Sequence, residues 1–224
     1  MVRLEHIGKR WDDGAELLHD ISLALEPGDF RFLTGASGAG KTTLLNMMTL
    51  AERPSHGNLG LLDNDVATLG RAARAALRRR IGMVFQDFRL IDELSVRDNV
   101  ALPLRIAGAG EREIRDHVSE LLGWLGIAHR TAARPPFLSA SEKQRVAIAR
   151  AIVHRPELLL ADEPTGHVDD ETALLLVRVF ERINALGTTV LIATHDTAFA
   201  RRFEHRRAHL ANGVLVEPAT GGPQ

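Results

Sequence analysis

The chain has 224 residues, of which 45% are hydrophobic and 25% are charged, enough to bury one large core or one core with a subdomain. Its formal net charge of -1 excludes a general attraction to nucleic acid, and its lack of cysteine excludes disulfides and thiolate metal sites, as in a reducing cytosolic setting. Apolar runs such as residues 190–193 are far shorter than the roughly 18 residues of a membrane span, and residues 1–11 lack the apolar segment of a signal peptide. We therefore expect no membrane-spanning segment.

The first part of the chain is predicted to be rich in strands. Residues 2–7 and 18–25 alternate between apolar and polar side chains, with a turn at residues 12–14 between them, so we expect an antiparallel pair. The next predicted elements are a strand at 29–34, a helix at 43–48, a small strand at 58–62, a basic helix at 71–80 and an apolar strand at 81–86. The basic helix is most simply a solvated face, with attraction to anionic lipid headgroups as the alternative.

From residue 87 to about residue 155 the pattern becomes helical. The predicted helices are 95–106, 111–125 and 140–153. Alternation of strands and helices then returns, with a strand at 157–161, a helix at 171–186, a strand at 188–193, a short helix after Asp196 and a hairpin at 212–213. This order predicts an α/β fold with a mainly parallel sheet, whose ligand binds at the carboxyl ends of the strands. The Gly/Pro-rich residues 218–224 predict a flexible tail.

Residues 35–42 fit the phosphate-loop pattern G-x-x-x-x-G-K-[ST] and lie between a predicted strand and a predicted helix. Glycines in such a loop let backbone N–H groups surround phosphate oxygens, while Lys41 brings a positive charge and Thr42 a hydroxyl for Mg²⁺. A chance Gly-rich turn is the alternative, and the strand-loop-helix context argues against it. A dinucleotide fingerprint is excluded because Thr43 stands where its third glycine should be. The expected ligand is a nucleoside triphosphate, held by Gly35, Ala36, Ser37, Gly38, Ala39, Gly40, Lys41, Thr42 and Thr43.

Polar side chains stand at the ends of three further predicted strands. Asp162 and Glu163 follow an apolar strand, where one carboxylate would hold Mg²⁺ and the next would polarise water. Gln86 and His195 end two other strands, and Gln86 is a candidate contact for Mg²⁺ and the attacking water. Each has a structural alternative: a helix cap or solvated turn for the acids, a structural histidine, and a hydrogen-bonded strand end for the amide. We expect the four strand ends, including the one that leads to Lys41 and Thr42, to meet at one site.

In their order along the chain, these motifs resemble the ABC-transporter ATPase family across nearly the whole sequence. The resemblance implies a P-loop NTPase with a RecA-like, mainly parallel sheet, an antiparallel β subdomain and a helical insertion. It would divide a single ABC ATPase domain into a nucleotide-binding core at 1–86 and 156–217 and a helical subdomain at 87–155. The implied cofactors are ATP and Mg²⁺.

The resemblance also assigns roles to single residues. Gln86 matches the family's Q-loop, and His195 matches its switch histidine. Asp169, which is preceded by Val168, matches its D-loop. Trp11 stands where the family places an aromatic side chain that stacks on adenine; ordinary half-buried packing is the alternative. In this assignment Glu163, His195 and Gln86 are the catalytic residues, and Thr42, Gln86 and Asp162 are the Mg²⁺ ligands.

The family signature corresponds to Ser139, Ala140, Ser141 and Glu142. In the family, two domains associate head to tail, and each ATP is enclosed between one phosphate loop and the other domain's signature, which implies a homodimer on ATP binding. The pattern S-x-x-E also predicts a capping box at the start of helix 140–153. Two glycines usually follow the serine, and this chain has Ala140 and Ser141 instead. Our hypothesis is that ATP binding survives while dimer closure and hydrolysis are weakened.

Within the family, residues 52–55, 77–83, 98–104 and 106–109 most resemble the cell-division branch. This implies an ATPase on the cytoplasmic face of the bacterial inner membrane that drives a transmembrane partner to regulate peptidoglycan hydrolysis, with a helix of that partner received near residues 86–95. A lipoprotein-releasing or macrolide-type exporter subunit and a weakly hydrolysing ATP-dependent scaffold are the alternatives. A DNA-repair ATPase is disfavoured, because the sequence has no long coiled coil and no cysteine for zinc.

Overall fold

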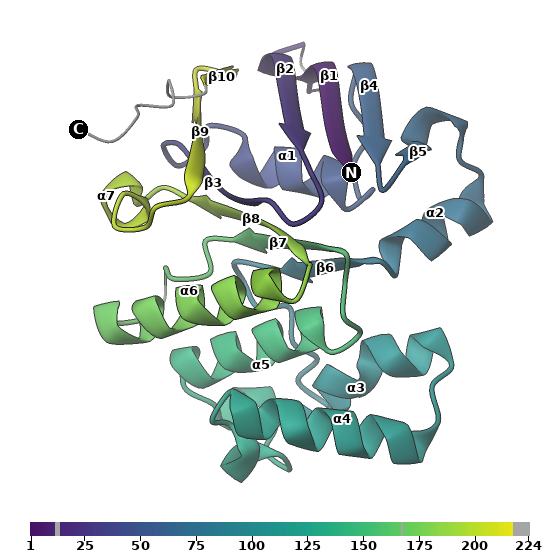
Figure 1. Ribbon diagram of the computed structural model, residues 1–224, viewed down its shortest axis with the longest axis vertical. Helices are drawn as coiled ribbons and strands as arrows, with labels where there is room; N and C mark the ends of the chain where they lie inside the picture. The colour runs from purple at the N-terminus through teal and green to yellow at the C-terminus, as the bar shows by residue number, and fades with distance from the viewer. Residues whose placement is uncertain (12–13, 167, 217–224) are drawn as a thin grey trace.

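The computed structural model describes residues 1–11, 14–166 and 168–216. Two sheets form its upper part in Figure 1, and a group of helices forms the lower part. Within the described residues, no helix combines the length and the apolar character that crossing a membrane requires. The predicted tail at 218–224 and part of the predicted turn at 12–14 lie outside the described residues.

The smaller sheet is antiparallel and has the strand order β2-β1-β4-β5. Its strands are β1 (Val2–Arg10), β2 (Glu16–Leu25), β4 (His56–Leu61) and β5 (Asn64–Asp65). The predicted antiparallel opening of the chain is confirmed, and both of its strands are longer than expected.

The larger sheet has the order β10-β9-β3-β8-β7-β6. It contains β3 (Phe30–Thr34), β6 (Ile81–Val84), β7 (Leu158–Asp162), β8 (Thr189–Thr194), β9 (Arg206–Ala211) and β10 (Val214–Val216). All neighbouring pairs are parallel except the hairpin of β9 and β10. The predicted α/β class with a mainly parallel sheet is confirmed.

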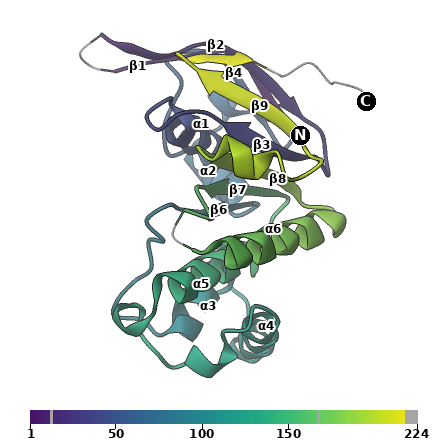
Figure 2. The same ribbon diagram turned by 90° about the vertical axis from the view of Figure 1, so that its left-hand side faces the viewer.

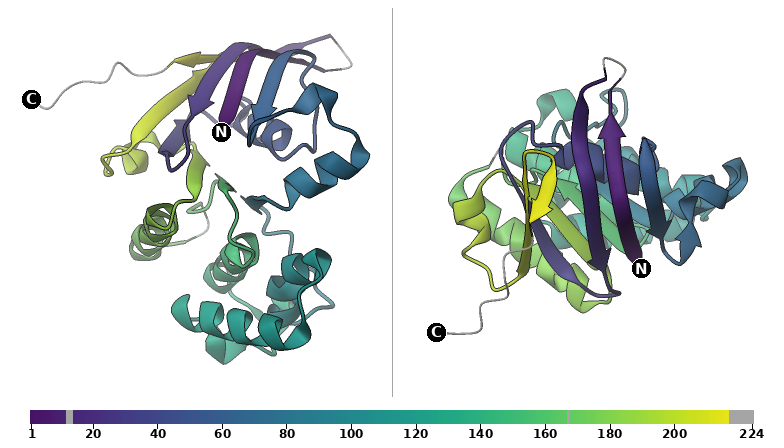
Figure 3. Two further views of the ribbon diagram at one scale, coloured as in Figure 1. Left: turned by 45° about the vertical axis from the view of Figure 1, so that its right-hand side comes forward. Right: turned by 90° about the horizontal axis from the view of Figure 1, so that it is seen from above.

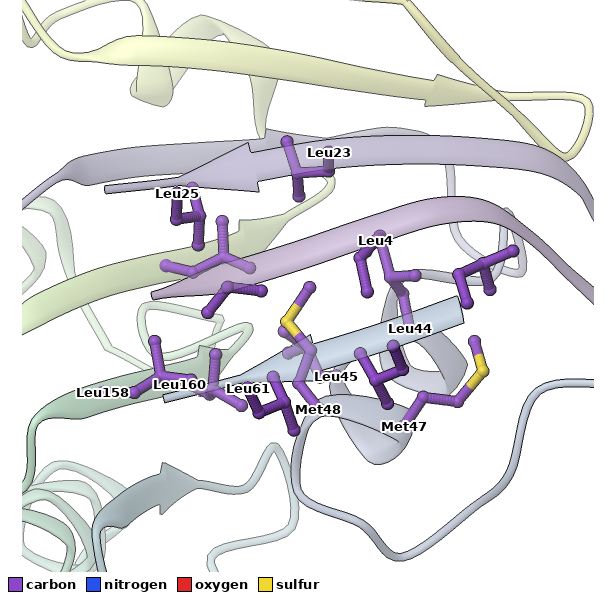
Figure 4. Packing of buried hydrophobic residues seen from close by; sticks show 14 of the residues in the cluster. Leu4, Leu23, Leu25, Leu44, Leu45, Met47, Met48, Leu61, Leu158 and Leu160 are labelled. Carbon is purple, nitrogen blue, oxygen red and sulfur yellow. The ribbon is translucent and has the colours of Figure 1, made fainter. Parts of the chain in front are cut away.

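Helix α1 (Lys41–Met48) lies between the two sheets (Figures 1 and 3). Figure 4 shows its side chains packed against both sheets, in a cluster that includes Leu4, Leu23, Leu25, Leu61, Leu158 and Leu160. Because strand side chains alternate in direction, Leu158 and Leu160 of β7 face α1, whereas Leu159 and Ala161 pack in the cluster of α6 (Asp170–Ala185) on the other side. The larger sheet is therefore buried on both faces.

Three further helices form a third hydrophobic cluster, below the sheets in Figure 2. They are α3 (Val96–Ala107), α4 (Glu111–Trp124) and α5 (Ala140–Ile152). Val100, Val118 and Val146 lie fully buried in this cluster, one from each helix. Short 3-10 turns at Val66–Thr68, Ala128–Arg130 and Pro135–Phe137, which periodicity alone does not reveal, connect the larger elements.

The basic helix is shorter than expected, because α2 (Arg71–Arg78) ends at Arg78. Two arginines at and beyond this end, Arg78 and Arg80, form contacts with other elements. Arg78 donates hydrogen bonds to the carbonyls of Thr49 and Leu50, just after α1. Arg80 forms two hydrogen bonds with Glu157, at 2.6 and 2.8 Å. At these two positions the arginines hold neighbouring elements together, so they are not part of a free basic face. A short helix, α7 (Thr197–Ala200), follows Asp196 as predicted.

Candidate active site

The phosphate loop, residues 35–42, connects β3 to α1. A side chain at Gly35 would place its Cβ 2.3 Å from the carbonyl oxygen of Leu210, so only glycine permits this close approach. Gly40 has φ 101°, a left-handed conformation that glycine adopts without strain, and it is the N-cap of α1. No side chain caps this helix, and its first turn contains no acidic residue. Its first N–H groups and its dipole are therefore directed at whatever anion the loop receives.

Lys41 is almost buried, and its ammonium lies across the loop. Its Nζ donates hydrogen bonds to the carbonyls of Gly35 at 2.8 Å and Ala36 at 3.1 Å. The same atom lies 3.4 Å from Oε1 of Glu163, while only 6% of the lysine side chain is exposed. A buried ammonium with one carboxylate beside it keeps capacity for further negative charge, which suits a phosphate group.

Asp162 is the last residue of β7, and its two carboxylate oxygens have different surroundings. Oδ2 accepts a hydrogen bond from the Thr42 hydroxyl at 2.7 Å, whereas Oδ1 is buried and accepts none. Burial raises the pKa of this carboxyl, and the Thr42 hydrogen bond opposes that shift. A buried carboxylate oxygen without a partner is costly unless a cation compensates it.

A hollow of about 320 Å³, which we call the Asp162 hollow, brings Thr42 and Gln86 to the same place as Asp162. A hydroxyl, an amide and a carboxylate offer the oxygen ligands that Mg²⁺ prefers, and Mg²⁺ sites usually combine one or two carboxylates with phosphate oxygens. These residues therefore fit Mg²⁺. Among the described residues, no group of three or more His, Cys, Asp or Glu side chains could hold a metal ion.

Glu163 and His195 stand together at the ends of β7 and β8. Glu163 has φ 46°, and its backbone N–H donates to the carbonyl of Ala193 at 2.9 Å, which ties the two strand ends together. Its Oε2 is 3.0 Å from Nδ1 of His195, although the contact lacks hydrogen-bond geometry. The glutamate side chain is 9% exposed and that of the histidine 55%. A nearly buried carboxylate with an unused oxygen is suited to accept a hydrogen bond from water.

Trp11 directly follows β1 and is 46% exposed. It lines a second hollow of about 450 Å³, the Trp11 hollow, together with Ser37, Gly38, Gly40, Lys41, Thr42, Thr43, Gln86, Glu163 and His195. The ammonium of Lys9 lies 5.6 Å from the centre of the indole ring, within cation–π range. The ring is thus beside the phosphate loop and outside the hydrophobic core. Ala36 and Ala39 line a third hollow, together with Leu210 and Gly213.

The signature begins helix α5, and the predicted capping box is present. The Ser139 hydroxyl accepts a hydrogen bond from the N–H of Glu142 at 3.2 Å, and the Glu142 carboxylate accepts one from the N–H of Ser139 at 2.8 Å. Ala140 and Ser141 are the first two helical residues, a conformation that both accept without strain. None of these four residues lines the Asp162 hollow or the Trp11 hollow.

Arg130 anchors Glu142 through hydrogen bonds of 2.7 and 3.4 Å. This interaction, with the Ser139 N–H as the second cause, lowers the pKa of Glu142 to about 2. Asp169 is the N-cap of α6, where its carboxylate accepts hydrogen bonds from the N–H and hydroxyl of Thr172, and these bonds lower its pKa. Asp169, the predicted D-loop residue, lines neither the Asp162 hollow nor the Trp11 hollow.

Some residues at this edge were not predicted. Asn46 and Asp87 also line the Asp162 hollow, with Phe85 and Arg89. Asn46 lies four residues after Thr42 on α1, so the helical repeat could have placed it on the same face. No comparable signal marks Asp87, because strand β6 ends at Val84, two residues before the predicted end at Gln86, and an irregular loop follows.

The family model described as "ABC transporter" matches residues 18–166. This chain belongs to the ABC-transporter ATPase family. The cell division ATP-binding protein FtsE of Escherichia coli (strain K12) is 44% identical over 96% of this ABC ATPase and 97% of the relative. The protein of the same name from Mycobacterium tuberculosis is 41% identical over 99% and 97%, respectively.

Solved structures agree with this assignment. The dimeric ABC-transporter cassette MJ0796, in a post-hydrolysis state bound to ADP and phosphate, has a TM-score of 0.90 and 31% identity, covering 97% of this chain and 98% of that one. The predicted P-loop NTPase fold and ABC ATPase architecture are thereby confirmed. The protein is an ABC ATPase that binds and hydrolyses ATP.

Proposed function

We propose that this ABC ATPase is the FtsE-type subunit of a bacterial inner-membrane complex, and that it drives an FtsX-type transmembrane partner to regulate peptidoglycan hydrolysis during cell division. The observation that supports this specific role is similarity along the full chain to cell division proteins named FtsE, at 36% identity for Bacillus subtilis (strain 168) and 44% for Escherichia coli. Membrane association comes through the partner, at the cytoplasmic face.

In this proposal the phosphate loop holds the triphosphate and the Trp11 ring stacks on adenine. When ATP binds, the Lys41 ammonium exchanges its bonds to the carbonyls of Gly35 and Ala36 for bonds to the β- and γ-phosphates. The nucleotide therefore replaces an internal contact of the chain.

Thr42, Asp162 and Gln86 would hold Mg²⁺ beside the phosphates. The chemistry that Mg²⁺ supplies at such a site is neutralisation of the charge on the β- and γ-phosphates. The Thr42 hydroxyl, which donates its hydrogen bond to Oδ2 of Asp162, would offer its oxygen to the cation, and the cation would compensate the buried Oδ1 of Asp162, which has no hydrogen-bond partner.

Glu163 orients and polarises the attacking water, with Lys41 beside one carboxylate oxygen and His195 beside the other. Lys41 lies beside Oε1, and Oε2 is buried without a hydrogen-bond partner, so this oxygen is placed to accept a hydrogen bond from the water. His195 is more exposed and contacts the γ-phosphate side of the site, and Gln86 contacts the same water from the Asp162 hollow.

The site is completed in the proposed homodimer by Ser139, Ala140, Ser141 and Glu142 of a second copy, with Asp169 at the interface. Two features support this: the related cassettes are dimeric, and these residues lie away from both hollows of their own chain. The core at 1–86 and 156–217 and the helical subdomain at 87–155 are the parts that would move relative to each other as the dimer closes.

A weakly hydrolysing, ATP-dependent scaffold is the second candidate, and Ala140 and Ser141 favour it. Their Cβ atoms occupy positions where the family has glycine, and each would approach the second copy's nucleotide. Absence of phosphate release from the complex with its membrane partner, together with retained ATP-dependent dimerisation, would establish the scaffold role.

A Glu163→Gln variant tests the site. Because the amide cannot accept a proton, turnover should fall by about 100-fold or more while ATP binding is kept, so the variant should elute as an ATP-dependent dimer in size-exclusion chromatography. Glu157→Gln, an acid-to-amide change beyond the other end of β7, is the matched control and should behave like the unmodified protein. A Glu163→Gln protein that stays monomeric with ATP would count against the mechanism.

The partner is tested separately, by affinity purification of the tagged ATPase from detergent-solubilised membranes of its own bacterium. We expect an FtsX-type membrane protein to be retained. Retention of a lipoprotein-releasing or macrolide-export membrane subunit instead would overturn the cell-division role and leave the ATPase chemistry intact.

A further inference from the structure

The loop after β6 contains two consecutive residues in the left-handed conformation. Phe88 has φ 61° and Arg89 has φ 47°, and neither is a glycine. Non-glycine residues in this conformation are strained and persist only where their surroundings hold them. Gln86 lies two residues before this turn, so the position of its amide depends on how the turn is held.

The turn has two backbone hydrogen bonds of its own, from the N–H of Phe88 to the carbonyl of Phe85 and from the N–H of Arg89 to that of Asp87, and a further contact comes from helix α5. Arg150 donates a hydrogen bond from Nη1 to the carbonyl of Arg89 and another from Nη2 to the carbonyl of Phe88. A guanidinium can do this because its N–H groups form a rigid planar fork that matches two adjacent acceptors. Arg150 is half-buried, and burial lowers its pKa while the nearby Asp87 carboxylate opposes that shift.

The backbone of α5 next to Arg150 is also held, by a close contact with β6. A Cβ at Gly82 would lie 2.2 Å from the carbonyl oxygen of Ala151, so β6 and the last turn of α5 touch backbone to backbone. Gly82 precedes the loop, and Ala151 follows Arg150. The strand that leads into the loop and the arginine that holds the loop therefore belong to one rigid contact.

The far end of the same loop is held by α3. The buried Asn99 side chain accepts a hydrogen bond from the N–H of Ile91 at 2.8 Å and donates to the carbonyl of Ile91 at 3.0 Å. Between the end of β6 and Ile91, the loop places Gln86 and Asp87 at the Asp162 hollow. The turn at Phe88 and Arg89 is thus the link between α5 and the residues that face Thr42 and Asp162.

We propose that Arg150 is a positioning residue for Gln86, and that it couples the signature end of α5 to the chain's own Mg²⁺-side residues. This inference rests on the proposed roles of Gln86 and of the signature. Helix α5 is a single element that carries Ser139 at one end and Arg150 at the other. Binding of a second copy's nucleotide to the signature would shift α5. Because the Arg150 guanidinium connects α5 to Phe88 and Arg89, this shift would also move Gln86.

The test replaces Arg150 by lysine, which keeps the charge but cannot bind both carbonyls in one fixed plane. Turnover should fall by roughly 5- to 30-fold, with the KM for ATP unchanged within about twofold, because the phosphate loop is untouched. Arg145→Lys is the matched control on the same helix, where the guanidinium lies beside Gly126 and not beside the loop. It should leave both constants unchanged.

A second readout does not depend on activity. Arg89 is exposed, so trypsin can cleave after it once the turn loosens. In the folded protein, Arg150→Lys should speed this cleavage several-fold, as mass spectrometry of the fragments would show, whereas Arg145→Lys should not. If lysine prevents folding, Arg150→Gln, which keeps one side-chain amide donor, is measured in the same way. Unchanged cleavage in whichever variant folds would overturn the proposal.

A double-mutant cycle separates this inference from the function on which it rests. If Arg150 acts through Gln86, the effects of Arg150→Lys and Gln86→Ala on kcat should not multiply, and the double variant should resemble Gln86→Ala alone. Independent, multiplying effects would overturn the role of Arg150 only. Normal turnover in Gln86→Ala would show instead that the proposed role of Gln86 is wrong, and the inference would fall with it.

Discussion

In the proposed dimer, helix α1 directs its first N–H groups at the chain's own triphosphate and helix α5 directs its first N–H groups at that of the second copy, and the two helices begin in opposite ways. Helix α1 starts after Gly40, with no side-chain cap and no acid in its first turn. Helix α5 starts after Ser139, whose hydroxyl takes one N–H, and it carries the Glu142 carboxylate in its first turn. One end is left open for a ligand, and the other is already stabilised by its own side chains.

The difference shows how the same backbone feature is used in two ways. An open helix end gains its anion stabilisation only when the ligand arrives, whereas a capped end is stable without it. On α5 the capping box uses the N–H of Glu142, so the donors left in the first turn are those of Ala140 and Ser141. These are the two positions at which the sequence departs from the family's glycines.

Loss of the charge at the open end should have the largest effect. Lys41→Ala removes a charge-assisted hydrogen bond to phosphate, so the Kd for ATP should rise by roughly 10- to 100-fold, as measured by isothermal titration calorimetry. Lys143→Ala, in the first turn of α5, is the control and should leave the affinity of the single chain unchanged. Equal losses of ATP affinity in the two variants would contradict the proposed difference between the two helix ends.

Restoring glycine at the capped end should have a smaller effect. The double substitution Ala140→Gly with Ser141→Gly removes both Cβ atoms from the surface facing the second nucleotide, and relief of about 1 kcal/mol corresponds to a turnover about fivefold higher. Phosphate release is the measurement, and ATP affinity should not change. A turnover equal to that of the unmodified protein would contradict the idea that these residues weaken closure.

The serine cap can be compared with one that has no proposed contact with nucleotide. Ser139→Ala and Ser95→Ala each remove a serine cap, since Ser95 accepts a hydrogen bond from the N–H of Asp98 at 3.1 Å in the same manner. Each should lower the free energy of unfolding by about 1 kcal/mol in urea titrations. Only Ser139→Ala should also reduce turnover; an equal reduction in both would assign the effect to stability.

The smallest expected effect is the pH dependence of the capping box. The folded pKa of Glu142 is lowered from 4.5 to about 2, so its carboxylate stabilises the fold above pH 4.5, and this contribution is lost as the pH falls toward 2. The difference in melting temperature between the protein and Glu142→Gln should therefore shrink over that range. A difference that grows on acidification would contradict the assigned ion pair with Arg130.

Local patterns predicted much of the fold and of the site. The phosphate loop, the carboxylates of Asp162 and Glu163 at the end of β7, and His195 after β8 could be placed from sequence, because each lies next to or at the end of a strand or helix with a clear repeat. Boundaries were less accurate. Lys41 and Thr42 were placed in the loop but begin α1, and β6 stops at Val84, where its register with β7 ends.

Contacts over long sequence separations were not predictable. Arg150 lies 61 residues after Arg89, and an arginine in a helix is usually read as a surface residue. Similarly, nothing local shows that Arg130, in a short turn, binds Glu142 of α5. In both cases the pairing is decided by how the helices pack, which a single sequence does not reveal.

Because α1 lies between the two sheets, nucleotide binding at its start affects the stability of the whole domain. Leu44, Leu45, Met47 and Met48 are fully buried in the cluster that joins both sheets, so we expect their amides, unlike those at the open start of the helix, to exchange with solvent mainly when the whole fold opens. The free energy of ATP binding at the phosphate loop therefore stabilises the folded state of the entire domain against global unfolding.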